Sequence, residues 1–178
     1  MTTKNGKLME MLTGYAAAHQ HPFNVFVHML GIPTIMLGVL IPLTWMNADI
    51  GGTSINMAHV VMLLFFFFYL TLDAWFAVAF LVLALLIAQL AAVIGEQPVA
   101  VSGSIAAAAF FGGYAAQFIG HAVEKSMPVL VKHPIRANLA APFFQVVEMF
   151  KILGLRDDLF DEVQRQIERQ RQQEASSG

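Results

Sequence analysis

The chain contains no cysteine among its 178 residues. This absence excludes disulfides, a cysteine nucleophile and thiolate metal ligands, and with them iron–sulfur clusters and cysteine-type structural zinc sites. Charge is scarce as well, because charged residues make up 12% of the chain and the formal net charge is −2, which argues against nucleic acid as a partner.

Lysine and arginine are absent from a long internal interval. All 10 of them lie outside the stretch between Met9 and Glu124, which consists mostly of aliphatic residues, methionine and phenylalanine. A charged side chain at the centre of a bilayer costs about 2.5–3.5 kcal/mol on insertion scales. The interval therefore predicts an integral membrane protein, in a bacterial inner membrane or the endoplasmic reticulum. The bases that flank both ends predict that both termini are cytoplasmic.

The interval is long enough for several spans. A hydrocarbon core of about 30 Å needs about 20 apolar residues per helix, so the apolar run from Met57 to Gly95 must fold back. We place the break at Asp73, the only acid within that run. The fold class is predicted as all-α, a polytopic four-transmembrane-helix bundle with interfacial and C-terminal amphipathic helices. The predicted spans are Phe26–Met46, Met57–Leu72, Ala74–Ile94 and Ser104–Val123.

Proline and small residues refine this prediction. Pro33 and Pro42 predict a kinked or split first span, and small residues such as Gly112 and Gly113 predict close packing of the last span. Beyond that span, three prolines are expected to break the chain into short pieces, with an amphipathic helix at 141–155 in the membrane interface. We expect residues 1–155 to form the membrane domain and 156–178 a soluble C-terminal helix and tail.

Histidines gather at one predicted depth of the membrane. Five of the six lie at the cytoplasmic ends of the first and last spans, whereas His59 is interpreted as a hydrogen-bonding residue. Imidazole is the common ligand of Fe, Zn, Cu and Ni, so this convergence indicates a metal site. His21 is either a ligand or the cap of the helix that begins at Pro22. The candidate ligands are His19, His28 and His121, with His133 just beyond them.

Two polar residues share faces with these histidines. Asn24 lies four residues before His28, and Glu124 lies three residues after His121, so each pair lies on one face of a helix. Glu124 either joins the site or forms an interfacial ion pair with Lys125. Histidines with one carboxylate and open positions favour non-haem Fe(II) and oxygen chemistry.

Two blocks of sequence resemble a known family. Residues 19–33 read HQHPFNVFVHMLGIP and residues 117–128 read QFIGHAVEKSMP. Both resemble signatures of the membrane 2-hydroxy fatty acid dioxygenase family, whose members are multi-span proteins. The adjacent histidine pairs of better-known membrane fatty acid hydroxylases and desaturases are absent from the chain.

The resemblance implies an Fe(II)-dependent dioxygenase that uses dioxygen to shorten a long-chain 2-hydroxy fatty acid by one carbon. It implies His19, His28 and His121 as iron ligands, with Asn24 and Glu124 beside them in catalytic roles. The bilayer would supply the substrate, with its acyl chain among the spans and its carboxylate at the interface. The bases that we expect to neutralise this carboxylate are Lys125, Lys132 and Arg136.

Two other classes of protein remain open. The same histidines could serve a zinc-dependent membrane hydrolase, which an anaerobic assay would separate from an oxygenase. They could also only form hydrogen bonds in a non-enzymatic membrane scaffold or carrier, which need hold no stoichiometric metal.

Overall fold

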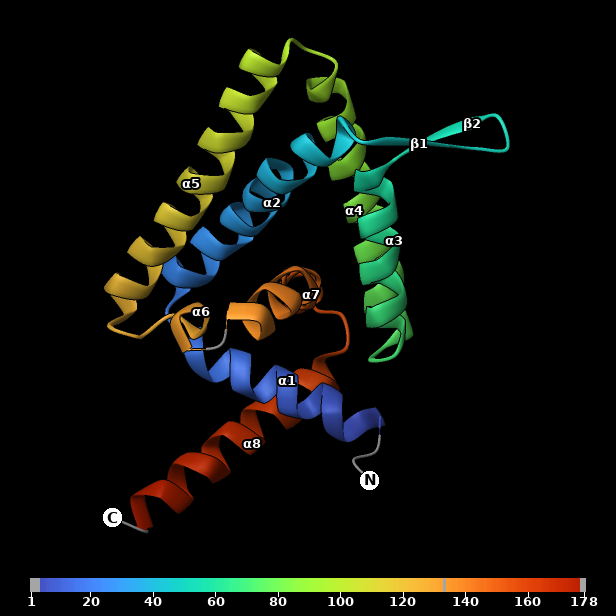
Figure 1. Cartoon of the computed structure of the whole chain (residues 1–178). Coiled ribbons are helices and arrows are strands. Elements are labelled where there is room, and N and C mark those ends of the chain that lie inside the picture. The colour runs from blue at the N-terminus through green and yellow to red at the C-terminus, as the bar shows by residue number, and fades with distance from the viewer. Residues whose placement is uncertain (1–3, 133, 177–178) are drawn as a thin grey trace.

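The fold is known from a computed structural model, which describes residues 4–132 and 134–176 and is 84% helical (Figure 1). The all-α membrane fold class is thereby confirmed. The elements are α1 Lys4–Ala18, α2 Pro22–Thr44, β1 Asn47–Ile50, β2 Thr53–Asn56, α3 Met57–Leu70, α4 Ala74–Gly95, α5 Val99–Glu124, α6 Val129–Lys132, α7 Pro134–Ile152 and α8 Asp157–Ser176.

Helices α2 to α5 correspond to the four predicted spans. Among the described residues, three of them, α2, α4 and α5, are long and apolar enough to cross a membrane. Helix α3 has 14 residues, about 21 Å at 1.5 Å per residue, and falls short of a full hydrocarbon core. The predicted fold-back is confirmed at Asp73, whose carboxylate accepts the first free N–H groups of α4 from Trp75 and Phe76.

The segment between α2 and α3 is an antiparallel hairpin of β1 and β2. Its turn is formed by Gly51 and Gly52, with φ of 60° and 81°. Both residues lie in the left-handed region that a tight hairpin turn requires, and glycine adopts that region without strain.

Helices α2 and α5 approach each other at glycines. A Cβ atom on Gly38 would lie 2.6 Å from the Phe110 nitrogen, and one on Gly113 would lie 2.6 Å from Cγ1 of Ile35. The predicted close packing of small residues therefore holds for Gly113, whereas Gly112 has no neighbouring atom within 4 Å. Helix α2 continues through both of its prolines, so the first span is not split.

Gly113→Leu is expected to destabilise the protein, because the added side chain meets Ile35 in a contact that has no room for it. Overpacking costs about 1–3 kcal/mol, which for a chain of this size lowers the Tm by roughly 2–12 °C. Gly112→Leu is the matched control: it adds the same side chain where no atom lies within 4 Å, so it should not lower the Tm. Thermal unfolding in detergent measures both. Equal shifts in the two variants would contradict the proposed α2–α5 contact.

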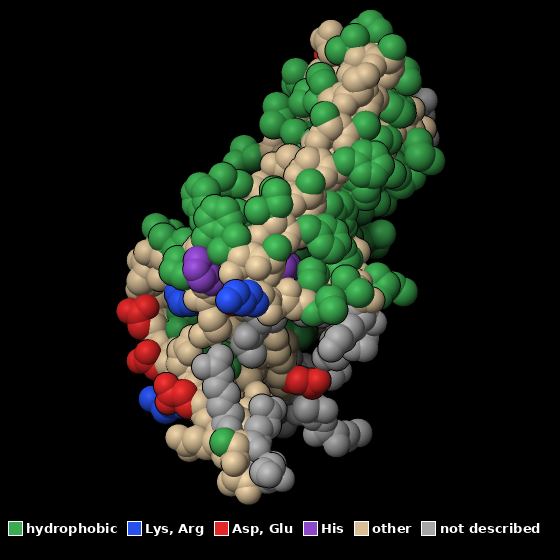
Figure 2. All heavy atoms as spheres, turned by 90° about the vertical axis from the view of Figure 1, so that its left-hand side faces the viewer, with side chains coloured by type: hydrophobic (Ala, Val, Ile, Leu, Met, Phe, Trp, Pro, Cys, Tyr) green, Lys and Arg blue, Asp and Glu red, His purple; other side chains and the backbone are tan. Residues whose placement is uncertain are grey.

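The helix pairs α2–α5 and α3–α4 meet near the hairpin and diverge toward the opposite end, where α7 lies between them (Figure 1). Helices α1 and α8 pack together at that same end, and both termini are found there. Figure 2 shows a hydrophobic upper part, while nearly all charged side chains visible on this face lie on the lower part. This division agrees with a membrane embedding of the upper part.

Helix α7 corrects one prediction. Pro142 was expected to break the chain but lies inside the helix, because the residues that follow it are held in the core. Phe143 and Val147 are fully or almost fully buried, and this burial offsets the one helical hydrogen bond that proline removes. The chain turns instead at Gly154 and Arg156, which both have positive φ.

Helix α8 is amphipathic, as predicted for the C-terminal helix. Val163 and Ile167 are buried, as are Leu8 and Leu12 of α1, and the two helices are in contact. Arg156, directly before α8, contacts the membrane helices as well. It forms an ion pair of 2.7 Å with Asp73 and lies over the Phe76 ring.

Candidate metal centre

Three histidines from separate parts of the chain converge at the charged end of the bundle. His19 follows α1, His28 lies in α2, and His121 lies in the last turn of α5. One ring nitrogen from each lies within 4.8 Å of the others, and the side chains are only 4–7% exposed. Among the residues that the structure describes, no other group of three or more histidines and carboxylates has this geometry.

The Nδ1 atom of each histidine ring has a hydrogen-bond partner within the protein. Nδ1 of His19 donates to the Tyr15 carbonyl and Nδ1 of His28 to the Asn24 carbonyl, each at 2.9 Å. Nδ1 of His121 lies 2.9 Å from the Ser126 hydroxyl. A ring that is oriented through one nitrogen presents the other to a metal, and this is the usual arrangement around ligated histidines.

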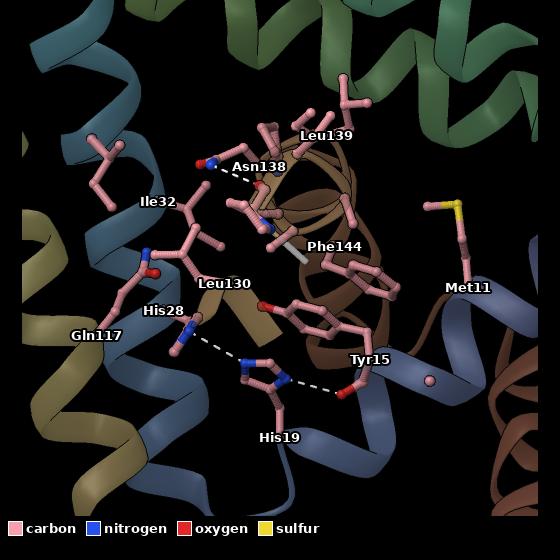
Figure 3. A pocket seen from close by; sticks show the side chains of 18 of the residues that line it. Met11, Tyr15, His19, His28, Ile32, Gln117, Leu130, Asn138, Leu139 and Phe144 are labelled. Carbon is pink, nitrogen blue, oxygen red and sulfur yellow. Dashed lines mark hydrogen bonds between the residues drawn. The ribbon is translucent and has the colours of Figure 1, made fainter. Parts of the chain in front are cut away.

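The Nε2 atoms of His19 and His28 show whether a metal ion fits between the rings. Because a carbonyl only accepts, Nδ1 of His19 and of His28 each carry the proton of the neutral ring. Their Nε2 atoms then point lone pairs at each other across 3.2 Å (Figure 3). Two facing lone pairs repel unless a cation lies between them, so the donor set fits a metal ion.

Burial keeps the first of these rings neutral. Desolvation, followed by the nearby His28 ring, lowers the pKa of His19 to about 3, so at neutral pH the ring is in the form that binds metals. The Tyr15 ring stacks on His19 at 3.8 Å and on Phe144 at 3.7 Å. This three-ring stack fixes the orientation of His19 (Figure 3).

Glu124 holds the turn between α1 and α2. Its Oε1 accepts backbone N–H groups from Gln20 at 2.6 Å and His21 at 3.0 Å. Its other oxygen accepts from the side-chain amide of Asn24. A Cβ on Gly120 would lie 2.4 Å from Oδ1 of Asn24, so the α2–α5 approach is close here too. Glu124 and Asn24 therefore position the turn that carries His19, and Glu124 is outside the three-histidine group.

The remaining predicted residues lie elsewhere. His21 caps α2 through a 3.2 Å bond from the Phe23 N–H, and His59 bonds to Asn56 at the start of α3. Lys125 ends α5 with a φ of 57° and an exposed side chain, and it forms no ion pair with Glu124 among the described contacts. Lys132 and Arg136 lie in α6 and α7. Their side chains, and His133 entirely, are outside the described residues.

A cavity of about 1460 Å³ begins at the three histidines and continues between the helices (Figure 3). Its walls come mainly from α1, α2, α3, α5 and α7, and apolar side chains dominate it. Along α2 it extends from His28 to Leu40, about 18 Å at 1.5 Å per residue. Its apolar lining includes Ile32, Met36, Val61, Met62, Phe65 and Phe110.

Sequence reasoning did not identify Gln117 as a residue of this cavity. Gln117 lines it, and its amide nitrogen is buried without a hydrogen-bond partner. Two signals could have found it: a polar residue within an apolar span, and a spacing of four residues from His121, which places both on one helix face.

One comparison with known proteins gives a match. The family described as "2-hydroxy-palmitic acid dioxygenase Mpo1-like" matches residues 6–152. That stretch includes the three histidines, the helices α2 to α5 and the residues that border the cavity on α7. No curated protein and no solved structure matches the chain.

Proposed function

The chain belongs to the family described as 2-hydroxy-palmitic acid dioxygenase Mpo1-like, and on this premise we propose that it is an Fe(II)-dependent dioxygenase that shortens a long-chain 2-hydroxy fatty acid by one carbon. The observation that carries the proposal is the three-histidine cluster at the head of an apolar cavity. Iron held by His19, His28 and His121 would supply dioxygen activation and a Lewis acid for the substrate oxygens.

The proposed reaction balances without an external reductant. A 2-hydroxy acid and one dioxygen molecule give the acid one carbon shorter, carbon dioxide and water. The bond between C1 and C2 breaks, C2 is oxidised from an alcohol to a carboxylic acid, and C1 leaves as carbon dioxide. The substrate itself provides the four electrons that reduce dioxygen.

The cavity offers a place for the acyl chain. Its extent of about 18 Å along α2 accommodates roughly 15 bonds of an extended chain, since three backbone bonds span at most about 3.3–3.6 Å. With the acyl chain beside Ile32 and Met36, the carboxylate lies at the histidines and the 2-hydroxyl lies next to it, on the side of the acyl chain. The packed apolar walls exclude water from the reacting carbon.

The protein's polar residues have supporting roles in this proposal. Asn24 and Glu124 hold the turn that positions His19. Lys132 and Arg136 stay proposed partners of the carboxylate, because the neighbouring segments of α6 and α7 border the cavity. Lys125 is the weaker choice, since its side chain is exposed and is outside the described cavity lining.

The experiment is turnover of 2-hydroxyhexadecanoic acid by purified protein supplied with Fe(II) and oxygen. Mass spectrometry should detect pentadecanoic acid, and the product should vanish under anaerobic conditions or with a chelator. Hexadecanoic acid is the matched substrate without the hydroxyl and should react far more slowly. Product formation that persists without oxygen would contradict a dioxygenase.

A zinc-dependent hydrolase is the second candidate, because three neutral histidines with an open position also form a common catalytic zinc site. The same assay separates the two, since hydrolysis needs no oxygen. Metal analysis of protein purified without added metal gives an independent answer.

A further inference from the structure

Gln117 is a buried hydrogen-bonding group at the edge of the candidate metal centre. Its amide nitrogen is shielded from solvent and has no partner among the described residues. A buried amide without a partner costs about 1–3 kcal/mol, so native structures rarely keep one unless something else binds there. The side chain also lines the cavity that begins at the histidines.

The position of this amide is well defined. A Cβ atom on Gly31 would lie 3.2 Å from Cγ and 3.4 Å from Nε2 of Gln117, so the amide rests against the α2 backbone where glycine leaves room for it. Figure 3 shows it beside α2, between Ile32 and His28. On α5 it lies one helical turn before His121. The amide is thus one turn deeper in the cavity than the metal centre.

The depth of the Gln117 amide in the cavity determines which group of the substrate lies beside it. If the carboxylate is at the histidines and the acyl chain follows the cavity, the first polar group on the deeper side is the 2-hydroxyl. A hydroxyl both donates and accepts a hydrogen bond, and a carboxamide does the same. An unsubstituted fatty acid has no group to offer, and it leaves the amide unpaired.

We propose that Gln117 recognises the 2-hydroxyl of the substrate and so determines the preference for 2-hydroxy over unsubstituted fatty acids. This assignment takes its class of ligand, a 2-hydroxy fatty acid, from the proposed function. It requires neither bound iron nor turnover. Among the described residues, the two other buried amides with an unpaired atom do not compete, because Asn24 and Gln145 are outside this cavity and their unpaired atoms are acceptors.

The test measures binding to metal-free protein, so that neither iron nor catalysis contributes. Displacement of a fluorescent fatty acid gives Kd values for 2-hydroxyhexadecanoic acid and for hexadecanoic acid. The wild type should prefer the 2-hydroxy acid by roughly 5- to 150-fold, the cost of leaving a buried polar group unpaired. In Gln117→Met, which removes both hydrogen-bonding atoms at similar volume, the ratio of the two Kd values should fall close to one.

Hexadecanoic acid also reports on folding, because a folded variant should bind it at least as well as the wild type does. Gln117→Leu provides a second variant if methionine perturbs the helix. Gln166→Met is the matched control: Gln166 lines the same cavity, but its amide is already bonded to Thr13 and Glu162. It should keep the wild-type ratio.

An unchanged ratio in folded Gln117 variants would overturn the assignment, and so would a wild type that binds the two acids equally. Failure of the proposed function has a different signature. In that case no iron-dependent and oxygen-dependent product forms, whereas the preference of the metal-free protein and its loss in Gln117→Met are measured independently.

Discussion

Replacing His121 with alanine is expected to abolish stoichiometric iron binding. The imidazole supplies one of three inner nitrogens, and loss even of an outer partner of a metal ligand costs 10–100-fold in affinity. Removing the ligand itself should therefore weaken binding by more than about 100-fold. His28→Ala should behave alike. Elemental analysis of purified variants, with the wild type at one metal per chain, measures the effect.

The control for this prediction is His59→Ala. His59 bonds to Asn56 at the far end of the bundle, so its loss should leave the metal content unchanged. Thermal unfolding gives a second readout, because a metal that binds only the folded state stabilises it by about 2.7 kcal/mol at 100 times its Kd. Added Fe(II) should raise the Tm of the wild type and of His59→Ala, but not of His121→Ala. Equal metal content in all three proteins would show that the cluster is not a metal site.

Met62→Trp is expected to shift the preferred substrate toward shorter acyl chains. Met62 is 5% exposed and lines the cavity on α3, away from the histidines. If the indole displaces two or three terminal methylenes, at about 0.8 kcal/mol each, the affinity for 2-hydroxyhexadecanoic acid falls roughly 15- to 60-fold. An acid three carbons shorter should lose little.

The neighbouring residue supplies the control. Leu63 is 41% exposed on the outer side of α3, so Leu63→Trp adds the same side chain outside the cavity. Competition binding across a series of chain lengths compares the two variants. A profile that is identical for Met62→Trp and Leu63→Trp would mean that the acyl chain does not enter the cavity beside α3.

Composition and spacing were sufficient to predict most of the membrane fold. The base-free interval and Asp73 located α2 to α5, because the bilayer penalises charge more strongly than local propensity favours any other structure. The incorrect predictions concern segments whose conformation depends on tertiary packing. Pro142 was expected to break the chain but lies within α7, because Phe143 and Val147 are buried, which no local pattern reveals.

The candidate site, too, could be predicted only in part from the sequence. A common depth predicted that histidines converge, the family resemblance pointed to His19, His28 and His121 among them, and the structure places these three together. The bonds of Glu124 could not be predicted, because they depend on how one turn lies against the end of α5. The stack of Tyr15 on Phe144 likewise joins residues far apart in the sequence.

The order of the three histidines along the chain has a consequence for biosynthesis. Two of them are synthesised before the membrane helices α3 and α4, and the third is synthesised after them. The cluster therefore cannot assemble until the last membrane helix has been inserted beside the first. A chain that stalls before α5 or inserts it incorrectly has His19 and His28 without the third histidine, so the complete three-histidine cluster forms only when α5 is in place.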